Sequence, residues 1–263
     1  MLSKSTVKLI RLLGQRKHRY HHQLFIVEGD KIVQEVLASS LETECLLAKD
    51  EWLDALPGGY TSGISEICRI SDSELSQISS LKTPNNALAI VRMPVYGLDI
   101  PELSDTLSLY LDQVQDPGNL GTIIRIADWF GIGHVLCGEG CADPYNSKTI
   151  QSTMGAVTRV RTHQVTPDIL GQVTSRYPGL PVYGTFLDGK NIYGEELSGK
   201  GIIVMGNESR GISRETAGFV GKRLLIPPYP AGSSTSESLN VAIATSVVCA
   251  EFRRQVSGYQ RNI

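Results

Sequence analysis

The fold of this chain is decided by the stretch Asp112-Gln113-Val114-Gln115-Asp116-Pro117-Gly118-Asn119-Leu120-Gly121, which continues to Arg125. An apolar run at 107–111 precedes it and a helical pattern at 120–129 follows it, so the stretch is predicted to join a strand to a helix. Two further stretches of this kind are Gly206-Asn207-Glu208-Ser209-Arg210-Gly211 and Ser238-Leu239-Asn240-Val241-Ala242. Because an α/β protein builds its ligand site where strands end in such loops, the three stretches together predict a ligand site.

Apolar runs and helical patterns alternate through the rest of the second half, which predicts a parallel sheet flanked by helices. The predicted strands are 107–111, 135–137, 160–162, 182–187, 201–205 and 224–226. The predicted helices are 120–129, 147–157, 169–176 and 239–254.

The first half has a similar but smaller pattern, which predicts a compact α/β unit with a parallel or mixed sheet. Helices are predicted at 4–13, from Asp30 to about residue 39, and from residue 71 onward; strands are predicted at 24–27, 45–48, 67–70 and 87–91. Between 94 and 105 the pattern lapses into Pro, Gly and isolated charges. We therefore expect two domains, 1–96 and 105–263.

Composition narrows the class of protein. Of the 263 residues, 41% are apolar and 20% charged, which is typical of a globular chain. The five cysteines are odd in number and include no Cys-x-x-Cys pair, which argues against a disulfide framework and a structural zinc site. No stretch approaches the roughly 20 apolar residues that span a bilayer, and no signal sequence opens the chain. These features predict a soluble cytoplasmic protein.

The amino-terminal residues are strongly basic although the formal net charge is -2, because no acidic residue precedes Glu28. The cationic residues of this run are Lys4, Lys8, Arg11, Arg16, Lys17 and Arg19, and His18, Tyr20, His21 and His22 lie among them. Cations displace counterions from phosphates and rings offer stacking faces, so the run suits RNA. A solvated helix face is the alternative interpretation.

The sequence lacks complete motifs for several common cofactors. Two Gly-x-x-x-x-Gly-Lys matches, at 184–190 and 194–200, lack the Ser or Thr that follows the lysine of a phosphate loop, and no helix is predicted after either. No Gly-x-Gly-x-x-Gly follows the first strand of either half, so a dinucleotide is not expected. His134 and His163 stand alone in the sequence, without a carboxylate or second His at metal-binding spacing. We therefore expect a surface or satisfied structural role for each histidine, and no metal site.

Taken in order, the three stretches resemble the SpoU-type, TrmH-like RNA ribose methyltransferases of the SPOUT class. The family shows Asn-x-Gly-x-x-x-Arg, then Gly-x-Glu-x-x-Gly, then an Ile-Pro turn leading to Ser-Leu-Asn-Val. The matching residues here are Asn119, Gly121 and Arg125; Gly206, Glu208 and Gly211; and Ile226, Pro227, Ser238, Leu239, Asn240 and Val241. The first half resembles the substrate-binding domain that often precedes the catalytic domain in this family. That substrate-binding domain is related to RNA-binding ribosomal proteins. The residues that carry this resemblance are Arg16-Lys17-His18-Arg19, Phe25-Ile26-Val27-Glu28-Gly29 and Lys31.

The resemblance implies a parallel sheet whose last loops and helix form a deep trefoil knot, an exception to the rule against threaded chains. It implies that the knot binds S-adenosylmethionine, that the enzyme is a homodimer through this region, and that its substrate is RNA, with ribosomal RNA favoured. Transfer RNA is an alternative substrate. A non-catalytic RNA-binding ribosome-assembly factor is an alternative function, whereas a hydrolase lacks its Gly-x-Ser-x-Gly elbow.

The resemblance also assigns roles to single residues. The cofactor-binding residues are Thr185, Phe186, Gly206, Gly211, Ile226 and Leu239, of which Gly206, Ile226 and Leu239 would bond the adenosine part through main-chain groups. Glycine at 206 would allow a close approach of the backbone. The catalytic residues are Asn119, Arg125, Glu208, Ser238 and Asn240, and the substrate-binding residues are Arg16, Lys17 and Arg19.

Arg125 is the family's catalytic arginine, and because a guanidinium is almost never neutral we expect it to position phosphate and stabilise charge rather than act as a base. In this hypothesis Ser238 and Asn240 hold the hydroxyl and Asn119 holds the loop. The alternatives are structural: Asn119, Glu208 and Ser238 as helix or turn caps, and Arg125 paired with an aspartate of its own stretch, Asp112 or Asp116. The interval between Ile226 and Leu239 is longer than in the family, which fits a lid, a specificity loop or an idle insertion.

Overall fold

The computed structural model of the chain describes residues 2–230 and 238–256. The chain forms two compact units: unit 1 comprises Met1–Val95 and Asp143–Thr158, and unit 2 comprises Tyr96–Ala142 and Arg159–Ile263. The break after Val95 falls at the expected composition change. The segment Asp143–Thr158 differs from the expectation, since it packs with unit 1 although the sequence placed it inside 105–263. The domain limits 1–96 and 105–263 therefore stay a prediction.

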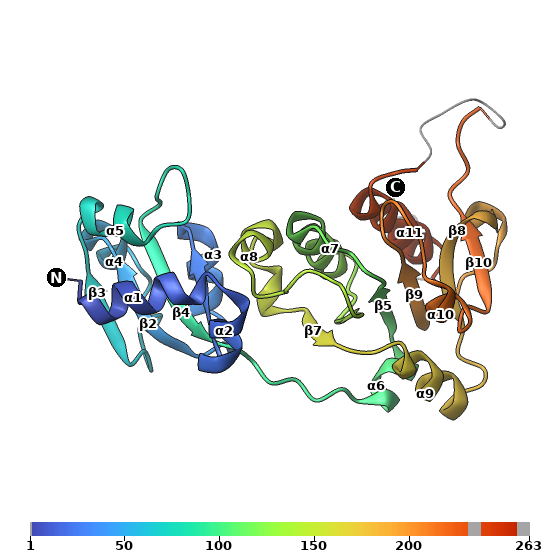
Figure 1. Cartoon of the computed structure of the whole chain (residues 1–263), viewed down its shortest axis with the longest axis horizontal. Coiled ribbons are helices and arrows are strands. Elements are labelled where there is room, and N and C mark those ends of the chain that lie inside the picture. The colour runs from blue at the N-terminus through green and yellow to red at the C-terminus, as the bar shows by residue number, and fades with distance from the viewer. Residues whose placement is uncertain (1, 231–237, 257–263) are drawn as a thin grey trace. The chain divides into compact units, whose positions relative to one another are not determined.

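Unit 1 is a mixed sheet between two layers of helices (Figure 1). Its strands are β1 (Leu24–Glu28), β2 (Thr43–Ala48), β3 (Glu66–Arg69) and β4 (Ala87–Arg92). Its helices are α1 (Lys4–Leu13), α2 (Arg16–His22), α3 (Asp30–Leu37), α4 (Asp50–Asp54), α5 (Asp72–Ile78) and α8 (Ser147–Thr153), and a 3-10 turn η1 (Ala156–Thr158) follows α8. The order is β1-β4-β2-β3, with β4 antiparallel to β1 and β2, and β3 parallel to β2.

The helix boundaries of unit 1 follow from capping. The hydroxyl of Ser3 accepts a hydrogen bond from the Thr6 amide at the start of α1, and α1 ends at Gly14. Ser71 and Glu74 form a capping box at the start of α5. Helices α1 and α5 cover one face of the sheet through one apolar cluster, whereas α3 and α4 cover the other face through a second cluster.

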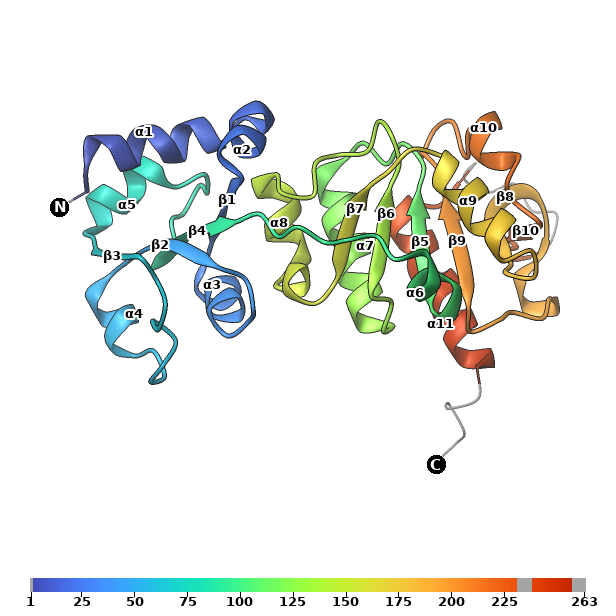
Figure 2. The same ribbon diagram turned by 90° about the horizontal axis from the view of Figure 1, so that it is seen from below.

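Unit 2 is a six-stranded sheet in which every pairing is parallel, in the order β10-β8-β9-β5-β6-β7 (Figure 2). Its strands are β5 (Leu107–Leu111), β6 (His134–Cys137), β7 (Arg161–Gln164), β8 (Val182–Asn191), β9 (Gly201–Met205) and β10 (Lys222–Leu225). Its helices are α6 (Ile100–Asp105), α7 (Pro117–Trp129), α9 (Asp168–Arg176), α10 (Arg214–Ala217) and α11 (Val241–Gln255), with a 3-10 turn η2 (Ile192–Gly194) after β8.

Helices cover both faces of this sheet. Helices α6 and α9 pack on one face through an apolar cluster that includes Leu103, Tyr110 and Leu170, whereas α7 and α11 lie against each other on the opposite face (Figure 2). The central strands β5 and β9 are buried at every residue, which is typical of a parallel sheet covered on both sides. The predicted α/β fold with a parallel sheet, preceded by a small α/β unit, is confirmed.

The differences in element boundaries have local causes. The helix predicted at 147–157 ends at Thr153, because Met154 and Gly155 have φ of 50° and 94° and start a 3-10 turn. The basic run at 16–22, which the sequence left without an element, is the short helix α2. Helices α4, α6 and α10 were also not predicted, since four to six residues hold too little apolar periodicity to reveal a helix.

The parallel arrangement positions the predicted site. Strands β5 and β9 are neighbours, and both point the same way, so the loops that follow Leu111 and Met205 leave the sheet at the same edge. None of the helices in the described part of the chain has the length and apolar composition that a bilayer span requires.

Candidate active site

Side chains from all three motif stretches are joined by hydrogen bonds in unit 2. Asn119 Nδ2 donates to Glu208 Oε1 at 2.7 Å, and Asn240 Nδ2 donates to Asn119 Oδ1 at 3.1 Å. Asn119 lies 89 residues from Glu208 and 121 residues from Asn240 in the sequence. The amide of Asn119 therefore bridges the loops that follow β5 and β9 and the start of α11.

Helices α7 and α11 are capped by Asp116 and Asn240, and not by Asn119 and Ser238 as the structural alternatives supposed. Asp116 caps α7, because its Oδ1 accepts from the Asn119 amide at 2.8 Å, and this leaves the Asn119 side chain for the bridge. Asn240 caps α11, since its Oδ1 accepts from the amides of Ala242 and Ile243 at 3.0 and 3.3 Å. The interpretations of Asn119 and Ser238 as helix caps are thus wrong.

The loop after β9 is closed on itself and tied to the loop after β5. Asn207 and Gly211 exchange two main-chain hydrogen bonds of 3.0 and 2.9 Å. Asn207 Nδ2 also donates to the Gln113 carbonyl at 2.8 Å, and the Ser213 amide donates to Asp112 Oδ2 at 2.7 Å. These roles of Asp112 and Asn207 were not predicted, although both residues lie inside the motif stretches. An Asx side chain next to a turn was the available signal.

The closed loop explains the glycine at 206. A Cβ on Gly206 would lie 2.4 Å from the Gly211 carbonyl carbon and 2.5 Å from the Ile212 nitrogen, so no other residue fits there. Gly211 has φ of 68°, which favours glycine. The expected close approach at Gly206 is thus made by the loop's own backbone.

Arg125 lies on the exposed side of α7 and is not part of this network. It makes no hydrogen bond or ion pair with any residue that the structure describes, which rules out the supposed pairing with Asp112 or Asp116 there. Its guanidinium is therefore available to a ligand. Ser238, two residues before the cap of α11, is likewise exposed and donates to no described residue.

The residues predicted to hold the cofactor lie within β8 and in the segments that follow β9 and β10. Thr185 Oγ1 contacts Met205 Sδ at 4.0 Å, which joins the interior of β8 to the last residue of β9. The guanidinium of Arg223 stacks 3.5 Å from the centre of the Phe186 ring and pairs with Asp188 at 2.5 Å. The stacking role of Arg223 was not predicted, because a single arginine in a short strand carries no sequence signal for such a contact.

Gly206, Ile226 and Leu239 share a feature that suits a ligand. All three lie just outside the strands and helices, and their main-chain groups make no turn, loop or cap hydrogen bond with another described residue. Peptide groups of this kind need water or a ligand as their partner. This donor and acceptor set fits the adenosine part of S-adenosylmethionine, which offers ring nitrogens, an amino group and ribose hydroxyls.

The basic run of unit 1 divides into two kinds of residue. Arg16 and Lys17 are exposed on α2, with Arg16 at 5.3 Å from the centre of the Tyr20 ring. Arg19 is only 3% exposed; it pairs with Asp143 at 2.5 Å and donates to the Leu13 and Gly14 carbonyls. Because its donors are used inside unit 1, the prediction that Arg19 contacts RNA is not supported by its position.

The two histidines that stand alone in the sequence meet in the structure, and both have a structural role there. His134 Nδ1 lies 3.1 Å from His163 Nε2, since β6 and β7 are neighbours, and His134 Nε2 lies 3.1 Å from Glu102 Oε1. Burial is the main cause that lowers the pKa of His163 to about 4, and the nearby His134 and Arg161 lower it further. The pair is thus a buried structural element of unit 2.

Within residues 2–230 and 238–256, one group of three metal-ligating side chains lies close together: Cys45, Glu66 and Cys68 in unit 1. Burial, with Cys68 and Glu66 nearby, raises the pKa of Cys45 to about 12. A raised pKa disfavours the thiolate that a metal would need.

Comparisons with known proteins agree with the motifs. The model of the SpoU rRNA Methylase family matches residues 106–250, and that of the MRM3-like substrate binding domain matches residues 4–89. The 23S rRNA (guanosine(2553)-2'-O)-methyltransferase RlmP of Bacillus subtilis is 31% identical over 94% of this chain and 95% of its own length. A 23S rRNA (uridine(2479)-2'-O)-methyltransferase of Streptomyces viridochromogenes is 27% identical over 94% of this chain and 88% of its own length.

Solved structures resemble the whole chain. A Porphyromonas gingivalis protein assigned to the TrmH family of RNA methyltransferases has a TM-score of 0.86 and 40% identity, covering 97% of this chain and 99% of that one. An rRNA methyltransferase of Sinorhizobium meliloti, solved with bound AdoMet, has a TM-score of 0.84 and 28% identity, covering 97% of both chains.

Proposed function

Because the chain belongs to the SpoU rRNA methylase family, we propose that it transfers a methyl group from S-adenosylmethionine to a ribose 2'-hydroxyl of ribosomal RNA. The observation that carries this proposal is the bridge from Asn119 to both Glu208 and Asn240, which unites the family's three motifs in one place. The names of the relatives from Bacillus subtilis and Streptomyces viridochromogenes, both 23S rRNA 2'-O-methyltransferases, support ribosomal RNA as the substrate.

The cofactor site that we propose consists of Thr185, Phe186, Gly206, Gly211, Ile226 and Leu239. When bound, S-adenosylmethionine supplies an electrophilic methyl group attached to a sulfonium. The free peptide groups of Gly206, Ile226 and Leu239 would hold the adenosine part. The stacking of Arg223 on Phe186 keeps this ring, which lies within β8, in place.

The reaction needs a correctly placed hydroxyl that loses its proton as the methyl group arrives. Among the predicted catalytic residues, three groups have no partner in the described part of the chain: Glu208 Oε2, the Ser238 hydroxyl and the Arg125 guanidinium. Arg125 would bind an RNA phosphate and stabilise the developing alkoxide, since the planar fork of a guanidinium matches phosphate oxygens. Ser238 and Asn240 would orient the hydroxyl, while Asn119 holds both loops at a fixed separation.

The knot is supported by the order of the sheet. Strand β10 is an edge strand beyond β8 and β9, whereas α11, which follows it, packs on α7, and α7 contacts β6 in the other half of the sheet. The chain must therefore return from the edge to the middle of the sheet, as the trefoil knot of the resembled family requires.

The homodimer is supported by exposed apolar side chains on the neighbouring helices α7 and α11. Trp129 is 84% exposed and Ile243 is 55% exposed. Exposed large apolar side chains on two packed helices are a feature that subunit interfaces use. A cytoplasmic location is supported by the cysteines, all five of which are free thiols.

Incubation of the purified protein with radiolabelled S-adenosylmethionine and ribosomal RNA tests the proposal, using RNA from a host that lacks the gene. We expect label in one RNA species, and none with an Arg125→Ala protein. Absence of label despite binding of both the methyl donor and RNA would contradict the proposal and favour the assembly factor.

A further inference from the structure

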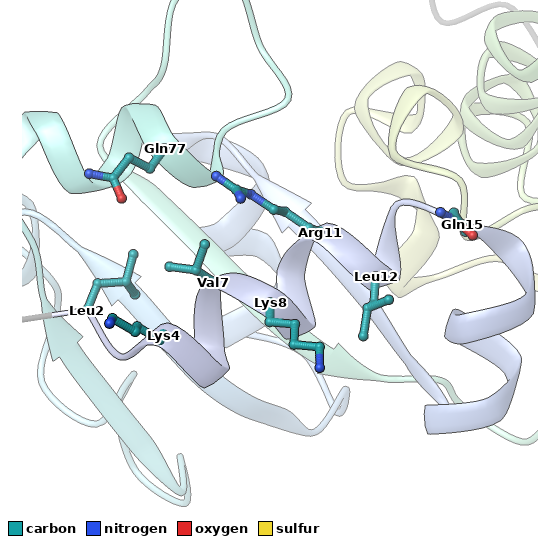
Figure 3. Close-up of a pocket in the computed structure, with 8 residues that line it drawn as sticks. All are labelled: Leu2, Lys4, Val7, Lys8, Arg11, Leu12, Gln15 and Gln77. Carbon is teal, nitrogen blue, oxygen red and sulfur yellow. The ribbon is translucent and has the colours of Figure 1, made fainter.

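A hollow of about 540 Å³ lies on the surface of unit 1 at helix α1 (Figure 3). The helix provides Lys4, Val7, Lys8 and Arg11 to it, and Gln77 of α5 lies opposite. The apolar part of the lining comes from Leu2, Val7 and Leu12. The hollow thus combines a positive wall with apolar surface.

The three cations form one stripe. Lys4, Lys8 and Arg11 stand at positions i, i+4 and i+7 of α1, which lie on the same side of a helix. None of them makes a hydrogen bond or ion pair with a described residue. By contrast, Arg69 pairs with Asp50 and Asp54 on the same unit.

The acidic side chain nearest in sequence to Gln77, Glu74, is already engaged. Its Oε1 accepts from the Leu2 amide at 2.7 Å and its Oε2 from the Ser71 amide at 2.9 Å. These bonds fix the start of α1 to α5 and hold the pKa of Glu74 at about 2. The Glu74 carboxylate is thus bonded to main-chain amides and makes no ion pair with the cations of α1.

We infer that this hollow binds the phosphate backbone of the substrate RNA. The stripe from Lys4 to Arg11 spans about 10 Å at 1.5 Å per residue. A nucleic-acid strand carries one charge per roughly 3.4 Å, so the stripe faces about three phosphates. The apolar surface from Leu2, Val7 and Leu12 gives a base or ribose a dry contact, as proteins that bind unpaired RNA do.

This inference rests on the proposed function and places its substrate on a defined surface. The basic run of the sequence suggested Arg16, Lys17 and Arg19 equally, but Arg19 is buried and paired. The structure thus selects the α1 stripe, where free cations and a hollow coincide.

The test compares binding of deproteinised ribosomal RNA by the full-length protein over a range of KCl concentrations. The variant Lys4→Gln/Lys8→Gln/Arg11→Gln should lose about three phosphate contacts. At roughly 0.7 to 0.9 per contact, the slope of log K against log salt becomes shallower by about two units. If the two lines meet near about 1 M salt, affinity at about 0.1 M falls about a hundredfold.

A control variant, Lys31→Gln/Lys82→Gln, removes exposed cations of unit 1 outside the hollow and should change the slope far less. A second variant tests the hollow without altering α1. Gln77→Glu brings a negative charge into it and should weaken binding, whereas Ser76→Glu, one residue away on α5 and outside the lining, should not.

Equal slopes for the wild type and the α1 variant, or equal losses for the α1 variant and its control, would overturn the inference. Wild-type RNA binding by Gln77→Glu would do the same. The proposed function is judged separately, by methyl transfer: a wild type that binds RNA through α1 but transfers no methyl group would contradict the function and support the hollow.

Discussion

Replacing Asn119 by alanine should uncouple the loops after β5 and β9 from the start of α11. The substitution removes the 2.7 Å bond to Glu208 and the 3.1 Å bond from Asn240, while the Asn119 amide keeps its bond to Asp116. Helix α7 should therefore begin where it does now. What is lost is the fixed separation between the loop that carries Glu208 and the helix that begins at Asn240.

The magnitude follows from the two bonds. A hydrogen bond to a carboxylate contributes about 1.5 to 3 kcal/mol and a neutral one about 1 kcal/mol, but both partners are accessible to water after the change. We expect the free energy of unfolding to fall by about 1 to 2 kcal/mol. Methyl transfer should suffer more, because a misplacement of about 1 Å costs roughly a hundredfold in rate.

The assay pairs urea unfolding with kcat/KM for methyl transfer to ribosomal RNA. Asn191→Ala is the matched control, since the Asn191 side chain makes only a local bond to the Tyr193 amide at 3.0 Å. This control should lose stability and keep full activity. In a double-mutant cycle with Glu208→Ala, the effects on rate should be coupled by about 1 kcal/mol. Full activity of Asn119→Ala, or strict additivity in the cycle, would refute the bridge.

Three further predictions concern single side chains. Arg125→Lys should lower turnover at least about tenfold, because an ammonium cannot copy the guanidinium fork; wild-type turnover would contradict this role. Arg19→Met should lower the free energy of unfolding in urea by about 3 to 5 kcal/mol, because it leaves Asp143 buried and without its cation. The exposed Arg16→Met should change it by less than about 0.5 kcal/mol, and equal effects would be evidence against the buried pair. Burial lowers the pKa of His163 to about 4, so below about pH 6.5 the unfolded chain binds a proton that the folded chain does not. The free energy of unfolding should therefore fall by about 2 kcal/mol between about pH 6.5 and about pH 5. This loss should be smaller in His163→Gln, and an unchanged pH profile in that variant would argue against the shift.

The strands and the motif loops were predictable from the sequence because their signals are local. The runs at 107–111 and 201–205 are apolar at nearly every position, and the structure has strands with these bounds. Helix α1 likewise has the predicted bounds, since its apolar residues recur at helical spacing between Ser3 and Gly14.

The side-chain contacts between these elements could not be predicted, because they join residues far apart in the sequence. Arg19 belongs to a basic run that suggests a surface, yet its partner Asp143 lies 124 residues away. His134 and His163 meet only because β6 and β7 pair in one register. The resemblance grouped Asn119, Glu208 and Asn240 by role, but that one asparagine holds the other two depends on the order of the sheet, which sequence periodicity does not specify.

The position of the transferred methyl group tests the central claim most directly. Ribosomal RNA that has been incubated with the protein and S-adenosylmethionine can be digested to nucleosides and separated by mass spectrometry. We predict one nucleoside whose ribose fragment carries the extra methyl mass and whose base is unchanged. A methyl group on a base, or no methylated nucleoside beyond those found with Arg125→Ala, would contradict the account.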